Sequence, residues 1–453
     1  MTYKPKAFLR KIFPQRLVNL FFHLPQAIFW TSFYRFPAKK MTVIGVTGTD
    51  GKTTTATLLW HILSKAGKKA GLVTTVEAKI GKKSFETGLH VTTPQPRLLQ
   101  KFYRGTQKEG IQYMVVEATS HGLDQYRLWG SYFYGGILTN ITAEHLDYHQ
   151  TYERLVCAKA KLFKNVRFAV LNKDDYSFKI IKPLVEKQNK PPKIITYSLK
   201  KEADFNLDNF PVKTRLPGDY NLANCLAAAA AAISLGIKKE TILEAIASFE
   251  GVTGRLESVV KGQNFAVYVD FAHTPNALKN VLGYLRKEAD RKGGRLIAVF
   301  GAAGLRDRQK RPQMGQIAAQ LADISILTAE DPRTEDVNDI INQISQGSKK
   351  GGAKETTEKN LLTLKNKKHY FLKIPDRREA IKTAVKIAQK NDIVVLCGKG
   401  HEKSMCFGTT EHPWSDRKEA EEAIKRELTR MRSELTRKIN SNVKSQNSKE
   451  FVG

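Results

Sequence analysis

Short apolar runs separated by amphipathic stretches organise the first half of the chain. Residues 41–48 (MTVIGVTG) have the pattern of a buried strand that enters a Gly-rich turn, and residues 53–67 continue as a helix closed by Gly67. Later apolar runs occur at residues 113–119, 135–141 and 167–172, with helical sequence such as residues 151–163 between them. Strands that alternate with helices in this way predict a parallel sheet wrapped by helices.

A second series of the same kind begins near Gly251. Its strands are predicted at residues 264–272, 295–304, 324–331 and 392–400, each followed by polar or helical sequence. We therefore expect an α/β protein with two domains. The expected divisions are a short basic and aromatic N-terminal segment (1–40), two α/β domains (41–250 and 251–428) and a polar tail (429–453), which we expect to be a frayed helix leading into disorder.

The composition indicates a soluble globular protein, with 41% hydrophobic and 26% charged residues. The net charge of +31 attracts nucleic acids, anionic lipids and phosphorylated substrates alike, and a solvated basic surface explains it equally well. We expect no nucleic-acid partner. The 4 Cys residues lack CxxC spacing, which favours neither a zinc site nor a disulfide framework and fits a reducing cytoplasm.

An uncharged aromatic stretch covers residues 17–34, between Arg16 and Arg35. It is just long enough for a membrane-spanning helix, but polar residues and a proline inside it make spanning costly. Its aromatic residues and basic flanks are typical of a segment that packs on its own protein or lies in a membrane interface. No small-residue cleavage site follows, so a secretory signal peptide is not expected.

The Gly-rich turn at residues 45–53 (GVTGTDGKT) carries the strongest chemical signal. Gly48 and Gly51 let backbone N–H groups approach phosphate oxygens. Lys52 can neutralise terminal phosphates, and the Thr53 hydroxyl can bind Mg²⁺. The turn predicts ATP binding by Gly48, Thr49, Asp50, Gly51, Lys52, Thr53 and Thr54.

The same turn departs from the usual phosphate-loop pattern, because Val46 occupies the first glycine position. The form GxTGTxGKTT resembles that of the Mur ligases and their folylpolyglutamate synthetase relatives. Further segments follow in the family's order: residues 117–127 (EATSHGLDQYR), 139–149 (TNITAEHLDYH), 254–257 (GRLE), 269–275 (VDFAHTP), 310–312 (KRP) and 398–402 (GKGHE). The resemblance runs from about residue 41 to about residue 425. The segments HLDYH, AHTP and GKGHE together resemble those of the muramyl-tripeptide synthetase branch.

This resemblance implies a central phosphate-loop ATPase domain and a C-terminal Rossmann-like domain. It implies that ATP phosphorylates a carboxylate of a muramoyl-L-Ala-D-Glu peptide, and that an incoming amine then displaces phosphate to form an amide. Lys159 matches a lysine that family members carry as a carbamate, an anion able to hold a second Mg²⁺. The catalytic and metal-binding residues implied are Lys52, Thr53, Glu117, His145 and Lys159, and the further ATP-binding residues are Asn224, Arg255, Asp270, His273 and Lys310.

The resemblance also implies which residues bind substrate. They are Thr92, Thr93, Ser120, His121, Gln125, Arg127, Arg306, Asp331, Arg333, Gly398 and Glu402. Arg333 lies in EDPR, where the family has DNPR, and can clamp the distal carboxylate of diaminopimelate, which lysine lacks. This favours diaminopimelate as the third amino acid. Two departures from the family keep lysine open: Glu330 stands where the family has Asp, and Asp331 stands where it has Asn and adds a negative charge that would favour a cationic side chain.

Three alternative functions fit this sequence less well. A folylpolyglutamate synthetase fits poorly with the HLDYH and GKGHE segments, and an amidase subunit acting on a lipid-linked muramyl peptide fits poorly with the absent zinc-binding cysteines. A non-catalytic ATP-binding adaptor fits poorly with the intact set of implied catalytic residues.

The segment before the phosphate-loop strand is the main departure from the family. Only about 40 residues precede that strand, which is too short for the domain that holds uridine diphosphate in typical members. We expect reduced uridine recognition, and a segment that either packs on the nucleotide domain or holds the enzyme at the anionic inner membrane face. We expect a cytoplasmic monomer, with peripheral membrane contact as an additional hypothesis.

Overall fold

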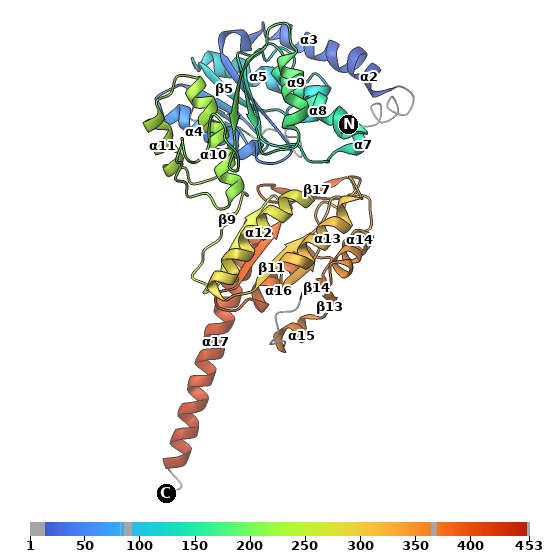
Figure 1. The fold of residues 1–453 in the computed structure, drawn as a ribbon. Coiled ribbons are helices and arrows are strands. Elements are labelled where there is room, and N and C mark those ends of the chain that lie inside the picture. The colour runs from blue at the N-terminus through green and yellow to red at the C-terminus, as the bar shows by residue number, and fades with distance from the viewer. Residues whose placement is uncertain (1–13, 82, 86–92, 364–368, 451–453) are drawn as a thin grey trace. The chain divides into compact units, whose positions relative to one another are not determined.

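The computed structural model describes residues 14–81, 83–85, 93–363 and 369–450, and it divides the chain into two compact units, Met1–Val252 and Thr253–Gly453 (Figure 1). Each unit contains a mostly parallel sheet with helices packed on it, so the α/β prediction is confirmed. Thr92, which was predicted to bind substrate, lies outside the described residues.

The sheet of the first unit has eight strands. They are β1 (Thr42–Thr47), β2 (Ala70–Val73), β3 (Ala78–Ile80), β4 (Lys83–Phe85), β5 (Tyr113–Glu117), β6 (Phe133–Leu138), β7 (Phe168–Asn172) and β8 (Lys193–Tyr197). Their order is β4-β3-β2-β5-β1-β6-β7-β8; the β2–β3 and β3–β4 pairs are antiparallel, and the other pairs are parallel. The central strands are apolar throughout because helices cover both faces.

Two sets of helices bury the two faces of this sheet. One core is shared by α4 (Lys52–Lys65), α10 (Asp219–Ser234) and α11 (Lys239–Ser248). The other is shared by α5 (Pro96–Lys108), α8 (Tyr152–Ala160) and α9 (Phe178–Glu186). Short helices α6 (Ser120–Asp124) and α7 (Leu146–His149) follow the ends of β5 and β6, and the 3₁₀ turn η3 (Lys161–Phe163) continues from α8. Buried alanines along α10 let it lie close against α4, as the Ala-rich sequence predicts.

The N-terminal segment is helical and packs on the first unit. It comprises α2 (Gln15–Val18), the π-helical η1 (Asn19–His23), α3 (Leu24–Phe33) and η2 (Pro37–Lys40). Ala27 and Thr31 are buried where α3 lies against α5, and the Thr31 hydroxyl donates to the Trp129 carbonyl at 3.3 Å. The packing interpretation is therefore confirmed for one face of the segment. In the described part of the chain, no helix is long and apolar enough to cross a membrane.

The sheet of the second unit has seven strands. They are β9 (Glu257–Ser258), β10 (Ala266–Asp270), β11 (Leu296–Phe300), β12 (Ile324–Leu327), β13 (Lys354–Glu355), β14 (Tyr370–Lys373) and β15 (Ile393–Cys397). Their order is β13-β14-β12-β11-β15-β10-β9, and β9 alone is antiparallel among these described strands. A separate hairpin joins β16 (Ser404–Phe407) to β17 (Thr410–Pro413). The helices are α12 (Pro275–Lys292), α13 (Lys310–Leu321), α14 (Val337–Lys350), α15 (Glu358–Thr363), α16 (Arg377–Ile387) and α17 (Asp416–Glu450).

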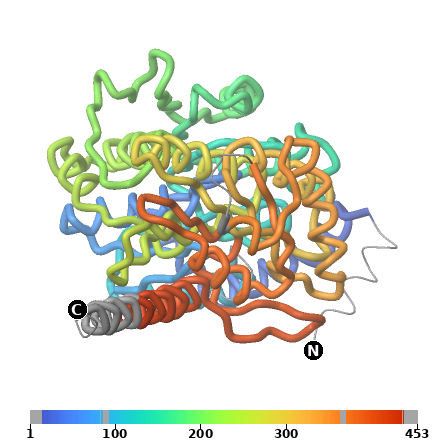
Figure 2. The backbone as a smooth tube through the Cα atoms, turned by 90° about the horizontal axis from the view of Figure 1, so that it is seen from below, coloured from blue at the N-terminus to red at the C-terminus, as the bar shows by residue number. Residues whose placement is uncertain are grey.

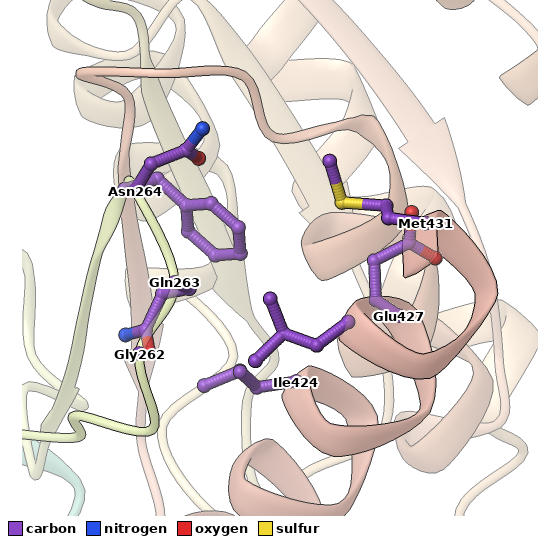
Figure 3. A pocket seen from close by; sticks show the side chains of 8 residues that line it. Gly262, Gln263, Asn264, Ile424, Glu427 and Met431 are labelled. Atoms are coloured by element: carbon purple, nitrogen blue, oxygen red, sulfur yellow. The ribbon is translucent and has the colours of Figure 1, made fainter. Parts of the chain in front are cut away.

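The end of the chain is helical. The sequence predicted a frayed helix leading into a disordered tail from about residue 429, and α17 runs from Asp416 to Glu450, drawn in red in Figure 1 and with its first turns in red in Figure 2. Arg430 forms ion pairs with Glu427 and Glu434, one turn away on either side, and no Gly or Pro interrupts the helix. Residues 424–431 of this helix border a small, mostly apolar pocket that contains no predicted site residue (Figure 3). The pocket is lined by Gly262, Gln263, Asn264, Phe265, Ile424, Glu427, Leu428 and Met431.

Candidate active site

The Gly-rich turn connects β1 to the N-terminus of α4. A Cβ atom at Gly48 would lie 1.8 Å from the Thr139 hydroxyl oxygen, and Gly51 has a left-handed φ of 80°, so both positions require glycine. Asn140 holds the turn from outside: its Oδ1 accepts from the Asp50 N–H at 2.9 Å, and its carbonyl accepts from the Thr49 N–H at 2.8 Å. The predicted loop is thus pre-shaped at a helix N-terminus, where backbone N–H groups favour an anion.

Glu117 ends β5 directly beside β1 and points into this loop. Its Oε2 accepts hydrogen bonds from the Thr53 hydroxyl at 3.0 Å and from the Thr75 N–H and hydroxyl at 2.9 and 3.0 Å. Lys52 Nζ lies 3.9 Å from Oε1, and Glu117 is only 1% exposed. The predicted meeting of Thr53 and Glu117 is confirmed. Thr75, in the loop after β2, has no motif of its own and was missed.

Lys159 is buried beneath the loop, at 3% exposure. It extends from α8, and its Nζ donates to the Gly48 carbonyl at 2.6 Å. Burial, and after it the positive charge of Lys52, lowers the pKa of Lys159 to about 7. A substantial fraction of this side chain is therefore a neutral amine near neutral pH, which is the form that can react with carbon dioxide.

His145 lies at the start of α7 in a left-handed conformation, with φ of 58°. Its Nε2 is 4.0 Å from a Glu144 carboxylate oxygen, and its ring packs edge-on against His121 at 4.9 Å between centroids. Within the described ranges, no three His, Cys, Asp or Glu side chains form a cluster able to hold a metal ion. The convergence of His145 with Thr53 on a metal therefore stays a prediction.

The predicted substrate residues after β5 form one connected network. Arg127 donates to the Thr93 carbonyl at 3.1 Å and to Gln125 Oε1 at 3.1 and 2.7 Å. The Thr93 hydroxyl bonds that of Thr119, the residue that caps α6, at 2.9 Å. Ser120 and Gln125 are buried, and the His121 ring lies 4.3 Å from that of Tyr148. Thr93, Ser120, His121, Gln125 and Arg127 are thus brought together.

A carboxylate that the sequence did not single out anchors this network. Asp124 Oδ2 accepts from the Asn19 amide at 2.7 Å and from the Tyr148 hydroxyl at 2.9 Å, while Oδ1 accepts from Lys161 Nζ at 2.6 Å. Burial raises the pKa of Asp124, but the bond and charge of Lys161 outweigh it and the net pKa is lowered. Lys161, at the end of α8, is exposed and still forms this ion pair.

Asn224 lies on α10 behind the Gly-rich turn. Its Oδ1 accepts from the Thr55 hydroxyl at 3.2 Å, its Nδ2 donates to Asn221 at 3.0 Å, and a Cβ at Gly51 would lie 2.4 Å from it. Its place beside the loop is compatible with nucleotide contact. Adenine contact by Asn224 stays a prediction.

In the second unit, the predicted nucleotide residues gather at the carboxyl end of β10. Asp270 accepts from the Leu256 and Ala272 N–H groups, each at 2.7 Å, and thereby fixes both flanking loops. Lys310 donates to the His273 carbonyl at 2.8 Å, and the Arg255 guanidinium lies 4.5 Å from the centre of the Phe271 ring. Arg255, Asp270, His273 and Lys310 are therefore brought together. A ribose bond to Asp270 stays a prediction, since backbone groups engage both of its oxygens.

The EDPR segment follows β12 with a strained backbone. Asp331 and Arg333 both have left-handed φ values, 48° and 55°. Asp adopts this conformation more readily than most residues, whereas it is uncommon for Arg and indicates local strain at Arg333. The Arg333 N–H donates to the Cys406 carbonyl at 3.1 Å, and its guanidinium donates to the Gly304 carbonyl at 3.2 Å. Arg333 is partly buried, and Arg306, near Gly304 in the chain, is exposed.

Lys399 connects this segment to the GKGHE loop. Its Nζ, fully buried, lies 2.7 Å from Asp331 Oδ1 and 2.5 Å from Glu402 Oε2. Asp331 Oδ1 also accepts from the Cys406 N–H at 3.0 Å. Gly398, with φ of 112°, brings the chain against the Glu330 side chain. Lys399 belongs to the quoted motif, but its pairing depends on the loops' meeting in space and was missed.

Glu330 is a buried carboxylic acid beside these charges. Burial raises its pKa to about 7, although Lys310 and Lys399 act in the opposite direction. Its Oε2 is buried without a hydrogen-bond partner. This group is therefore largely protonated below neutral pH.

A phosphate loop with a buried carboxylate, followed by a Rossmann-like unit, defines an ATP-using enzyme of two α/β domains. The family model described as Mur ligase middle domain matches residues 46–232, and that described as Mur ligase, glutamate ligase domain matches residues 254–400. The chain belongs to the Mur ligase family of ATP-dependent amide ligases.

Relatives with known names are similar along most of the chain. It is 36% identical over 420 residues to the UDP-N-acetylmuramoyl-L-alanyl-D-glutamate--2,6-diaminopimelate ligase of Clostridium botulinum, covering 88% of this chain and 81% of that protein. It is 38% identical over 428 residues to the UDP-N-acetylmuramyl-tripeptide synthetase of Roseiflexus sp., covering 87% and 80%.

Solved structures show the same fold. A structure of a UDP-N-acetylmuramoyl-L-alanyl-D-glutamate--2,6-diaminopimelate ligase matches with a TM-score of 0.56 and 32% identity, covering 86% of this chain and 79% of that one. The folylpolyglutamate synthase of Mycobacterium tuberculosis complexed with ADP matches with a TM-score of 0.62 at 13% identity, covering 83% and 91%. That second similarity concerns the fold alone.

Proposed function

We propose that this enzyme uses ATP to join diaminopimelate to the D-glutamate carboxylate of a muramoyl-L-Ala-D-Glu peptide, as the third residue of a peptidoglycan precursor. The observation that carries this proposal is the strained EDPR segment, which holds Arg333 beside the buried Asp331–Lys399 pair. Strain of this kind persists where the surroundings enforce it for a function.

The residues of the phosphate loop perform the first half of the reaction. The N-terminus of α4 at Gly51 and Lys52 and the Lys52 ammonium stabilise the charge that develops as the γ-phosphoryl group moves to the substrate carboxylate. The product is an acyl phosphate and ADP. No nucleophilic side chain is needed, because the substrate carboxylate is itself the nucleophile.

We expect two Mg²⁺ ions beside the phosphate loop. Glu117 and the Thr53 hydroxyl form an all-oxygen pair, which suits the hard Mg²⁺ ion, and would hold the first. Lys159 as an ammonium would repel a second ion, whereas its carbamate, with His145, would hold one. Bound magnesium would supply charge neutralisation for the transferring phosphoryl group.

The second half of the reaction needs a positioned amine. We propose that Arg333 pairs with the distal carboxylate of diaminopimelate, while Glu402 accepts from its distal ammonium. The opposite end then presents its amine to the acyl phosphate, phosphate leaves, and the new amide remains. The Arg127–Gln125–Thr93 network would bind the muramyl peptide.

We place the enzyme in the cytoplasm as a monomer, with its N-terminal segment at the inner membrane face.

The test is ADP release with and without a muramoyl-L-Ala-D-Glu substrate and each diamino acid. ADP release that depends on both the peptide and diaminopimelate is the expected result. Turnover that is independent of the muramyl peptide would exclude the proposed reaction.

A further inference from the structure

The N-terminal segment, residues 14–40, has one face fastened to the first unit. Asn19, His23, Ala27 and Thr31 are buried and follow one another at intervals of four residues, so they form a single stripe along the helices. Asn19 bonds Asp124 at 2.7 Å at one end of the stripe, and Thr31 bonds the Trp129 carbonyl at 3.3 Å at the other. If this segment crossed a membrane, these contacts with the first unit would be lost.

The remaining surface of the same helices is apolar and exposed. Phe21, Phe29 and Phe33 are 73%, 59% and 64% exposed, although burial is the usual state of phenylalanine. Leu17, Leu20, Phe22 and Ile28 are exposed as well. Phe29 and Phe33 stack at 6.2 Å, so neighbouring rings gather into one patch. Exposed patches of this kind mark interaction surfaces.

Charge distinguishes between the partners this patch could accept. Residues 1–40 contain 8 Lys or Arg and no Asp or Glu. Arg16, Arg35, Lys39 and Lys40 are exposed around the apolar residues. A second copy of a chain with a net charge of +31 would be repelled, whereas an anionic surface would be attracted.

We propose that the outer face of residues 14–40 docks on an anionic phospholipid bilayer, with the exposed phenylalanines among the acyl chains and the Lys and Arg side chains among the headgroup phosphates. The helices lie in the plane of the headgroups. Because Asn19 on the inner face bonds Asp124, the docked bilayer lies next to the loop network that would bind the muramyl peptide. The inference rests on the membrane placement proposed above, and not on the ligase chemistry.

Flotation of the full chain tests this docking. Vesicles of phosphatidylcholine, with and without phosphatidylglycerol, are mixed with protein at low salt. We expect the wild type to float with the phosphatidylglycerol vesicles and at least roughly tenfold less with the neutral ones. The triple variant Phe21→Glu, Phe29→Glu, Phe33→Glu should lose flotation by at least roughly tenfold, since it removes apolar contacts and adds negative charge.

The matched control is Tyr176→Glu, a change of a 67% exposed aromatic residue elsewhere in the first unit, which should float as the wild type does. Thermal unfolding and ligation of soluble substrate should be unchanged in the triple variant, so a failure of docking is distinguishable from a failure of the ligase proposal. Flotation of the triple variant at the wild-type level would overturn the docking surface. A dimer seen by light scattering, lost in the triple variant and unaccompanied by flotation, would assign the face to self-association instead.

Discussion

Lys399 and Asp331, both buried, form an ion pair of 2.7 Å between the GKGHE loop and the EDPR segment. Asp331 replaces the family's Asn, and its extra negative charge had seemed to favour a cationic lysine substrate. The pairing offsets that charge inside the protein. Glu330 exchanges one acidic residue for another and adds no charge, and burial raises its pKa to about 7, so it is largely neutral below neutral pH. The electrostatic argument for a lysine substrate is therefore weakened. We expect Arg333 to determine the preference for diaminopimelate over lysine.

The first prediction concerns the choice of amino acid. Arg333→Ala should lower kcat/KM for diaminopimelate by roughly 30- to 1,000-fold, because losing a carboxylate clamp costs about 2–4 kcal/mol. Turnover of lysine, which lacks the distal carboxylate, should change little. Asp331→Asn restores the family residue and should keep the preference for diaminopimelate. A lysine preference in the wild type that survives Arg333→Ala would rule out the clamp.

The second prediction concerns the phosphate loop. Lys52→Ala and Glu117→Ala should each reduce ligation by on the order of a thousandfold, because each removes a charge that acts on phosphate or metal. The near-isosteric Glu117→Gln should be similarly impaired in ligation with an unchanged melting temperature. ADP release and thermal unfolding are measured together. Substantial ligation by both alanine variants would contradict the assignment.

The third prediction concerns the modification of Lys159. The low pKa makes the neutral amine available, so ¹³C-labelled bicarbonate should give a carbamate signal in the wild type that Lys159→Ala lacks. Lys159→Ala should lose ligation, and Lys159→Glu should retain part of it, because a carboxylate stands in for the carbamate. Added bicarbonate should raise wild-type activity. Equal activity in all three proteins would remove the carbamate from the mechanism.

The fourth prediction concerns stability against pH. Glu330 has a folded pKa of about 7 against an ordinary value of 4.5. Between these values the unfolded chain ionises first, so the contribution of Glu330 to the free energy of unfolding falls as pH rises from 4.5 to about 7 and is constant below and above that window. The shift corresponds to about 3 kcal/mol. Urea unfolding is measured at pH 5 and pH 7.5, which bracket most of the window. The free energy of unfolding of the wild type should fall between these pH values by this amount more than that of Glu330→Gln. If the free energy of unfolding changes equally with pH in both proteins, the raised pKa of Glu330 is refuted.

The fifth prediction concerns Asn19 as a positioning residue. Asn19→Ala removes a donor to the Asp124 carboxylate, so the muramyl-peptide loop should lose order and KM for that substrate should rise by roughly tenfold, with kcat nearly unchanged. Gln15→Ala, which removes a partner of Asn19 itself, is the milder control. A lower melting temperature with an unchanged KM would indicate a purely structural role.

The α/β class, the phosphate loop and the family could be predicted from the sequence alone, because they depend on local patterns. Glycine at positions 48 and 51, a strand before them and a helix after them can all be recognised within about 25 residues. Glu117 could be placed beside the loop because parallel strands bring their carboxyl ends to the same edge of a sheet.

Contacts between segments far apart in the chain could be identified only in the folded structure. Asn19 meets Asp124 across 105 positions, and Lys399 meets Asp331 across 68, and no periodicity encodes such pairs. The perturbed pKa values of Lys159 and Glu330 also depend on burial, which follows from how the layers pack. The exposed face of residues 14–40 was ambiguous in sequence for the same reason: only the packed structure shows which side of an aromatic helix the protein itself covers.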